Sequence, residues 1–209
     1  MEIHAQRAGV TGAHGPLLRP TSLTVRPGEL TLVAGDPGTG HTALGLLLSG
    51  RMKPSTGTVS PELKTLRKHV VLVDAPEVNE PEEALTLAAV VGEELAMNGM
   101  ASGKKAVHDW LVEHAADEHA ASRFEHVPPR TRCAVLLDLA AARPGVTALV
   151  LDCPDRYHPD PREWFALAHD HVTPERSVVV LCSNSSAQIL DLPHARLGED
   201  NDTKMETSA

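Results

Sequence analysis

Residues 30–42, LTLVAGDPGTGHT, decide the fold of this chain. The mostly apolar run 30–34 predicts a short buried strand. The glycines and the proline of 35–40 cannot continue a strand, whereas Leu44, Leu47 and Leu48 recur at helical spacing and predict a helix over 42–49. The resulting order of strand, glycine loop and helix is typical of a phosphate-binding loop.

The glycine loop fits the pattern GxxxxG[K][ST], except that His41 stands where the pattern has lysine. Glycines at these positions let successive backbone N–H groups turn toward a phosphate, and the following helix directs its positive end to the same point. The hydroxyl of Thr42 is a candidate ligand of Mg²⁺. The candidate nucleotide-binding residues are Gly35, Asp36, Pro37, Gly38, Thr39, Gly40, His41, Thr42 and Ala43. The alternative is a helix-capping turn that binds nothing.

The rest of the chain repeats buried strands and helices. Apolar runs at 69–73, 148–152 and 178–182 predict further central strands, and a helical pattern extends from 85 to about 126. Helical spacing returns at 133–140, and 75–83 is rich in Pro and Glu, which predicts a loop. We therefore expect an α/β fold with a mostly parallel central sheet in one domain, 1–197. This domain would include a small helical subdomain at about 84–142, and 198–209 would form a disordered polar tail.

Composition excludes several classes of protein. The formal charge is −9 and aromatic residues make up 2% of the 209 residues, so no basic, aromatic-rich surface for nucleic acid is expected. The 12 histidines form no HExxH motif, and the three cysteines form no CxxC pair, which argues against a zinc site or a disulfide framework. No apolar run approaches the roughly 20 residues that span a bilayer. A cytoplasmic protein is expected, associated with a membrane only through a partner.

Two segments resemble the ATP-binding cassette (ABC) ATPases. Residues 22–59, SLTVRPGELTLVAGDPGTGHTALGLLLSGRMKPSTGTV, are similar to the opening of these domains, and RCAVLLDLAAARPG followed by TALVLDCPD is similar to their later helix and Walker B strand. The resemblance implies a P-loop NTPase fold that binds ATP and Mg²⁺, with Thr42 and Asp152 at the metal. It also implies a transmembrane transporter subunit as partner at the inner face of the membrane, and a homodimer or a heterodimer with another cassette subunit.

The chain departs from this family wherever the family performs hydrolysis, so we assign no catalytic residue. Cys153 replaces the glutamate after Asp152, and a neutral thiol cannot polarise water as a carboxylate does. Ser183 stands at the position of the switch histidine. Pro128 and Pro129 fall where the LSGGQ signature would present backbone N–H groups, which proline lacks.

Four other positions leave alternatives open. Asp155 could reach the attacking water or be a plain turn carboxylate, and Arg130 could approach a phosphate of a partner or lie free on the surface. Asp74 or Ala75 occupies the place of the family's glutamine after the second strand. The nearest ring that could stack on adenine is that of His14.

His41 sets the expected pH dependence. Lysine carries a permanent charge between the β- and γ-phosphates, whereas an ordinary histidine is mostly neutral near pH 7. If His41 contacts phosphate, binding should strengthen as the pH falls. The alternative is that His41 only caps the loop.

Four hypotheses follow from the sequence. The first is an ATP-binding subunit that docks on a membrane subunit and hydrolyses ATP weakly or not at all. The second is a working ATPase whose missing groups come from an intact paired subunit. The third is a nucleotide-independent adaptor, or regulatory pseudo-ATPase, that keeps the fold for protein interaction. The fourth is another P-loop enzyme, such as a small kinase.

Overall fold

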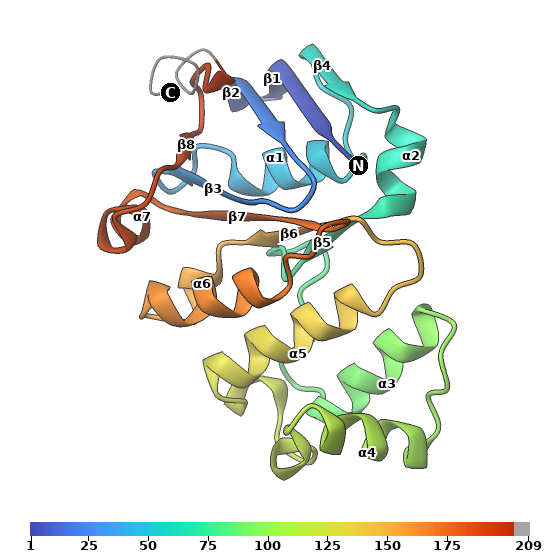
Figure 1. The fold of residues 1–209 in the computed structure, drawn as a ribbon. Helices are drawn as coiled ribbons and strands as arrows, with labels where there is room; N and C mark the ends of the chain where they lie inside the picture. Colours follow the sequence, from blue (N-terminus) through green and yellow to red (C-terminus); the bar gives the residue numbers. More distant parts are fainter. Residues whose placement is uncertain (203–209) are drawn as a thin grey trace.

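Two sheets with helices between and beneath them build the protein, which a computed structural model describes over residues 1–202 (Figure 1). The strands are β1 (Ile3–Gly12), β2 (Gly15–Val25), β3 (Leu30–Gly35), β4 (Thr56–Ser60), β5 (Val70–Val73), β6 (Ala148–Asp152), β7 (Ser177–Ser183) and β8 (Ala195–Arg196). The α-helices are α1 (His41–Leu48), α2 (Leu63–His69), α3 (Leu87–Met97), α4 (Lys104–Glu113), α5 (Pro129–Ala141), α6 (Pro161–Asp170) and α7 (Asn184–Leu190). Short 3₁₀ helices lie at Asp117–His119, Phe124–His126 and Pro154–Arg156.

The central sheet is parallel, with the strand order β5-β6-β7-β3-β8. Strand β6 is buried along its whole length, and β7 is buried up to Ser183, which is why both read as continuous apolar runs. The register pairs Gly35 with Ser183 and Asp152 with Leu181. The carboxyl ends of β3, β5, β6 and β7 therefore meet at one edge. The expected α/β fold with a mostly parallel sheet is confirmed.

A second, antiparallel sheet of order β2-β1-β4 lies above α1, so that α1 is held between the two sheets (Figure 1). The inner side chains of α1, Leu44, Leu47 and Leu48, are fully buried and pack with Val33 and other residues of the central sheet. Gly45 allows the close approach, because a Cβ there would lie 2.7 Å from a methyl group of Leu72. The glycine loop thus begins a helix that cannot shift without disturbing both sheets.

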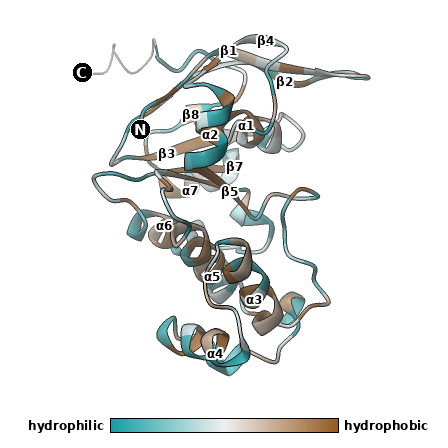
Figure 2. Ribbon diagram, turned by 90° about the vertical axis from the view of Figure 1, so that its right-hand side faces the viewer, coloured by the Kyte–Doolittle hydropathy of each residue, from teal (hydrophilic) through white to brown (hydrophobic). Residues whose placement is uncertain are grey.

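Helices α5 and α6 cover the opposite face of the central sheet, and α3 and α4 pack beyond them (Figures 1 and 2). Figure 2 shows hydrophobic residues along α3 and α5 and more polar residues on α4. Cys133, Leu136, Leu137 and Ala140 of α5 are buried, as their helical spacing predicts. The small helical part expected in the fold is present, although the boundary of a separate subdomain at 84–142 stays a prediction.

The prediction of a disordered tail over 198–209 is wrong for residues 198–202. The backbone N–H of Gly198 donates to Thr21 Oγ1 over 2.9 Å, and the side chain of Asn201 donates to the carbonyl oxygen of Ser22 over 2.9 Å. Asn201 is buried, and these hydrogen bonds attach the segment to β2. Polar composition gave no sign of this docking, and residues 203–209 lie outside the described residues. Within residues 1–202, no helix is both long and apolar enough to span a bilayer.

Candidate functional site

The glycine loop leaves β3 at Gly35 and enters α1 at His41 with the geometry of a phosphate cradle. Gly38 and Gly40 have positive φ angles of 79° and 110°. The first bond of the helix runs from the N–H of Leu44 to the carbonyl oxygen of Gly40 over 2.9 Å. The N–H groups of His41, Thr42 and Ala43 therefore have no acceptor within the helix. They would face an anion bound in front of its first turn.

Gly40 is required by space as well as by its φ angle. A Cβ at this position would lie 2.4 Å from the carbonyl oxygen of Leu17. The loop is further fixed by Thr39, whose hydroxyl donates to the carbonyl oxygen of Asp36 over 2.6 Å. Asp36 Oδ1 in turn accepts a hydrogen bond of 2.7 Å from Asn184 of α7. The cradle is thus preorganised by hydrogen bonds to its own backbone and to the start of α7.

The loop opens onto a cavity of about 710 Å³. The residues around it are Leu17, Pro37, Gly38, Gly40, His41, Thr42, Ala43, Leu46, Met52, Pro76, Glu77, Val78, Cys153, Asp155, Arg156 and Ser183. The cradle therefore faces the loop after β5, the turn after β6 and the end of β7. His14 lies exposed in the turn between β1 and β2 and is not among the described residues around the cavity, which include no Phe, Trp or Tyr.

Asp152, at the end of β6, is fully buried, and both of its carboxylate oxygens lack a hydrogen-bond partner within the described chain. Such a group calls for a compensating partner, because burying an unpaired carboxylate is costly. Helix α1 packs against β6 and begins at the same sheet edge. Thr42 borders the cavity, whereas Asp152 lies buried behind the residues that line it. Residues 1–202 hold no cluster of three or more His, Cys, Asp or Glu side chains able to bind a metal.

One carboxylate and one hydroxyl fit Mg²⁺ only with further oxygen ligands, and nucleotide phosphates commonly supply these. Asp152 and Thr42 therefore fit a metal that arrives with a phosphate.

His41 does not lie free in the cavity. Its Nε2 donates to the carbonyl oxygen of Cys182 over 2.8 Å, because only an N–H can pair with that acceptor. The neutral ring then has no proton at Nδ1 to offer a phosphate. Only a ring protonated at both nitrogens could donate to Cys182 and to an anion together.

Among the positions that the resemblance aligns with hydrolytic residues, Asp155 and Ser183 are bonded to each other and to Ser186. Asp155 Oδ2 accepts 2.8 Å hydrogen bonds from the backbone N–H of Ser183 and from Ser186 Oγ. Ser183 Oγ accepts from the backbone N–H of Ser186 and caps α7. Burial and the adjacent Asp152 raise the pKa of the Cys153 thiol above its ordinary value, so it stays protonated. Ser183 and a protonated Cys153 cannot act as a general base for water, and the Oδ2 atom of Asp155 is occupied by these two hydrogen bonds.

The start of α5 carries the two prolines that sequence comparison places at the signature. Pro128 precedes the helix and Pro129 is its first residue, so neither offers an N–H group at this end. Arg130 is exposed. Arg132, which the sequence did not single out, is buried and pairs with Asp74 at the end of β5, with 2.7 Å between Nη2 and Oδ1. Asp74, one of the two residues that the resemblance places at the family's glutamine, therefore belongs to a buried ion pair.

A second arginine missed by the sequence analysis, Arg156, lies in the turn after β6. Its Nη1 donates to Glu80 Oε2 over 3.0 Å, Nη2 donates to the carbonyl oxygen of Asp74, and Nε donates to that of Cys153 over 3.3 Å. A hydrogen bond from the N–H of Glu77, aided by Arg156, holds the pKa of Glu80 below its ordinary value. Burial raises the pKa of Asp74, and the two arginines oppose that effect.

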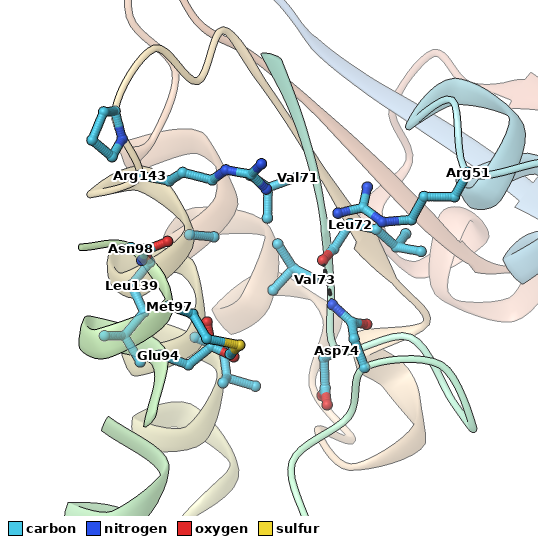
Figure 3. A pocket seen from close by; sticks show the side chains of 14 residues that line it. Arg51, Val71, Leu72, Val73, Asp74, Glu94, Met97, Asn98, Leu139 and Arg143 are labelled. Carbon is cyan, nitrogen blue, oxygen red and sulfur yellow. Dashed lines mark hydrogen bonds between the residues drawn. The ribbon is translucent and has the colours of Figure 1, made fainter. Parts of the chain in front are cut away.

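The same loop after β5 borders a second hollow of about 410 Å³, between α3 and the edge strand β5 (Figure 3). Figure 3 shows Arg51 and Arg143 reaching toward β5 from opposite sides, with Glu94 and Met97 on α3. Burial lowers the pKa of Arg51, and repulsion by the charge of Arg143 lowers it further. Asp74 borders this hollow and is also hydrogen-bonded to Arg132 and Arg156.

No protein-family model matches the chain, and no curated protein matches its sequence. Solved structures do match. An ABC transporter ATP-binding protein from Pyrococcus furiosus aligns with a TM-score of 0.69 and 16% identity over 97% of this chain and 98% of its own. A nucleotide-free ATP-binding cassette of an ABC transporter gives 0.65 and 14% over 100% and 96%. A cassette in its ADP conformation gives 0.64 and 16% over 88% and 82%.

The architecture is that of a P-loop NTPase. Within that class the fold is that of the ATP-binding domains of ABC transporters, as the resemblance of residues 22–59 implies. At these identities the similarity establishes the fold alone, and the activity of this chain has to be argued from its own residues.

Proposed function

We propose that this protein is a nucleotide-binding subunit that binds Mg-ATP in the 710 Å³ cavity and hydrolyses it slowly or not at all. One observation carries the proposal. The unpaired N–H groups of His41, Thr42 and Ala43 and the unpaired carboxylate of Asp152 belong to elements that end at one sheet edge, so that a phosphate and its metal would satisfy both. Slow hydrolysis follows from Cys153 and Ser183, which supply neither a base nor a charge.

Equilibrium titration with Mg-ATP near pH 6 and near pH 8 tests this function. We expect saturable binding that is stronger at pH 6, because only the imidazolium of His41 can donate to both Cys182 and a phosphate. In His41→Gln the affinity should lose this pH dependence. Release of inorganic phosphate should stay near background at both pH values. An affinity that does not change with pH would contradict the role of His41, and absence of saturable binding at both would contradict nucleotide binding itself.

The assembly we propose is docking on a separate membrane subunit at the cytoplasmic face, with pairing of two cassette subunits. The support is the fold, which is similar to that of a chain in an inward-facing structure of a metal-chelate type ABC transporter, with a TM-score of 0.62 and 19% identity over 86% of this chain and 72% of that chain. Co-expression with a membrane protein encoded beside this chain, followed by co-purification in detergent, tests docking. Solution mass with and without Mg-ATP tests pairing, and phosphate release by a mixed pair would reveal an intact partner that supplies the missing groups.

A second function, that of a nucleotide-independent adaptor, is favoured by the bonds of His41 and Arg156. The side chains of His41 and Arg156, which both border the cavity, already have partners within the protein, so neither needs an anion to complete its hydrogen bonding. The titration separates the two functions, because an adaptor shows no saturable nucleotide binding at either pH.

A further inference from the structure

The cavity beside the glycine loop is poorly supplied with positive charge. Glu77 and Asp155 border it, and Arg156 is the one Lys or Arg among the described residues around it. The lysine of the usual loop is replaced by His41, whose Nε2 proton goes to Cys182. A triphosphate bound in this cavity at neutral pH would therefore meet Mg²⁺, the backbone N–H groups and Arg156, the one Lys or Arg side chain that borders the cavity.

Arg156 is held by partners that it can exchange. Its side chain is 26% exposed, and its one direct ion pair below 3.5 Å is with Glu80, whose side chain is 29% exposed. Tyr157 also donates to the same oxygen of Glu80, over 3.3 Å. The carboxylate of Asp74 lies 3.9 Å from Nη2 of Arg156, but its stronger bonds go to Arg132. Loss of the Glu80 contact would therefore leave Asp74 neutralised and free Nη1 of Arg156 for another anion.

We propose that Arg156 is the phosphate-binding cation of this cavity, replacing the missing loop lysine, and that Glu80 competes with the phosphate for it. This inference rests on the proposed nucleotide binding. When a phosphate enters, Nη1 of Arg156 exchanges the carboxylate of Glu80 for a phosphate oxygen, and no covalent bond changes. The Arg156–Glu80 pair is then a latch whose strength sets the affinity for the nucleotide.

The two members of the pair give opposite predictions. Arg156→Gln removes the cation and should weaken Mg-ATP binding at pH 8 by about tenfold or more, because hydrogen bonds to charged groups are among the strong ones. Glu80→Gln removes the competitor and should strengthen binding by about threefold to tenfold. Both variants break the same ion pair. If losing the pair only perturbed the structure, the affinity for Mg-ATP would change in the same direction in both variants.

The experiment is titration of Mg-ATP into wild type, Arg156→Gln, Glu80→Gln and Arg162→Gln at pH 8, with inorganic phosphate as a second probe and thermal unfolding as a check on folding. Arg162 is the charge-matched control, because its side chain is 69% exposed on α6 and borders neither cavity. We expect Arg162→Gln to bind Mg-ATP with the same affinity as wild type. The inference is overturned if Arg156→Gln binds within twofold of wild type, or if Glu80→Gln weakens binding.

The test also separates this inference from the proposed function. Binding by wild type that is insensitive to both substitutions leaves the proposed function intact and removes the role of Arg156. Binding by Glu80→Gln but not by wild type supports the latch and shows that the wild-type cavity is held closed to nucleotide. Absence of binding in all four proteins overturns both the proposed nucleotide binding and the role of Arg156.

Discussion

The guanidinium group of Arg132 binds both carboxylate oxygens of Asp74, with Nη2 2.7 Å from Oδ1 and Nε 3.3 Å from Oδ2. Its carbon atom Cζ lies 4.5 Å from the ring centre of Phe124 and 3.8 Å from that of Tyr157. The side chains of Arg132 and Asp74 are only 5% and 8% exposed. This pair joins the end of β5 to α5, and through Arg156 it reaches the turn after β6.

Arg132→Met should therefore destabilise the protein by about 3–5 kcal/mol, because it leaves the Asp74 carboxylate buried with one direct partner removed. Urea unfolding followed by circular dichroism measures the change. The double variant Asp74→Asn/Arg132→Met should recover part of the loss, since no buried charge remains. Arg130→Met, two residues earlier and exposed, is the control and should unfold as wild type does. A loss below about 1 kcal/mol for Arg132→Met would contradict a tightly coupled pair.

Much of the fold could be predicted because its signals are local. The runs at 148–152 and 178–182 are fully buried strands and 30–34 is buried from Leu32 onward, since a strand covered on both faces is mostly apolar. The glycine loop also specifies its own geometry through φ angles that other residues resist. The docked segment 198–202 could not be predicted, because its hydrogen bonds join residues about 180 positions apart and leave no periodic pattern.

The candidate site could be predicted from the sequence only at positions where the residue type and its place in a motif already indicate the chemistry. The cradle around Gly40 follows from motif spacing and the strand-end carboxylate of Asp152 from the resemblance, and the strands that lead to them, β3 and β6, end at the same sheet edge. The roles of Arg132 and Arg156 depend on which carboxylate each one meets across the fold. Sequence alone leaves a buried arginine indistinguishable from an exposed one such as Arg130.

Gly40→Ala and Gly38→Ala should differ strongly although both glycines have positive φ. A Cβ at Gly40 would lie 2.4 Å from the carbonyl oxygen of Leu17, whereas a Cβ at Gly38 meets nothing within 4 Å. We expect Gly38→Ala to cost about 1–2 kcal/mol through its backbone alone, and Gly40→Ala to cost more and to abolish Mg-ATP binding. Chemical unfolding and the titration described above measure both. Equal losses in the two variants would contradict steric control by Leu17.

Asp152→Asn should move stability and binding in opposite directions. Without a metal, the substitution replaces an unpaired buried carboxylate by a neutral amide and should raise the unfolding free energy by about 1 kcal/mol. The same change removes a metal ligand, so Mg-ATP should bind much more weakly and added Mg²⁺ should no longer improve the affinity for ATP. Unfolding in EDTA and ATP titrations with and without Mg²⁺ give the two readings. Lower stability in EDTA would show that the carboxylate has a partner in the protein.

The last prediction concerns His171, at the end of α6, whose two ring nitrogens both face acceptors. Nδ1 lies 2.8 Å from the carbonyl oxygen of Leu167, and Nε2 lies 3.0 Å from Oδ1 of Asp138 on α5. Burial works against the charged ring, and Arg176, which donates to the carbonyl oxygen of His171, opposes it as well. The two hydrogen bonds outweigh these effects and raise the pKa of His171 above its ordinary value.

Because the pKa of His171 is higher in the folded protein than in the unfolded chain, the charged ring stabilises the fold. This contribution is complete below the unfolded pKa of about 6.5 and is lost as the pH rises through the folded value. His171→Gln should therefore lose on the order of 1 kcal/mol near pH 6 and progressively less toward pH 8.5. Urea unfolding of both proteins across this range measures the difference, with Asp138→Asn expected to follow the same trend. A difference that grows with pH would mean that the neutral ring is the form that the Asp138 site favours.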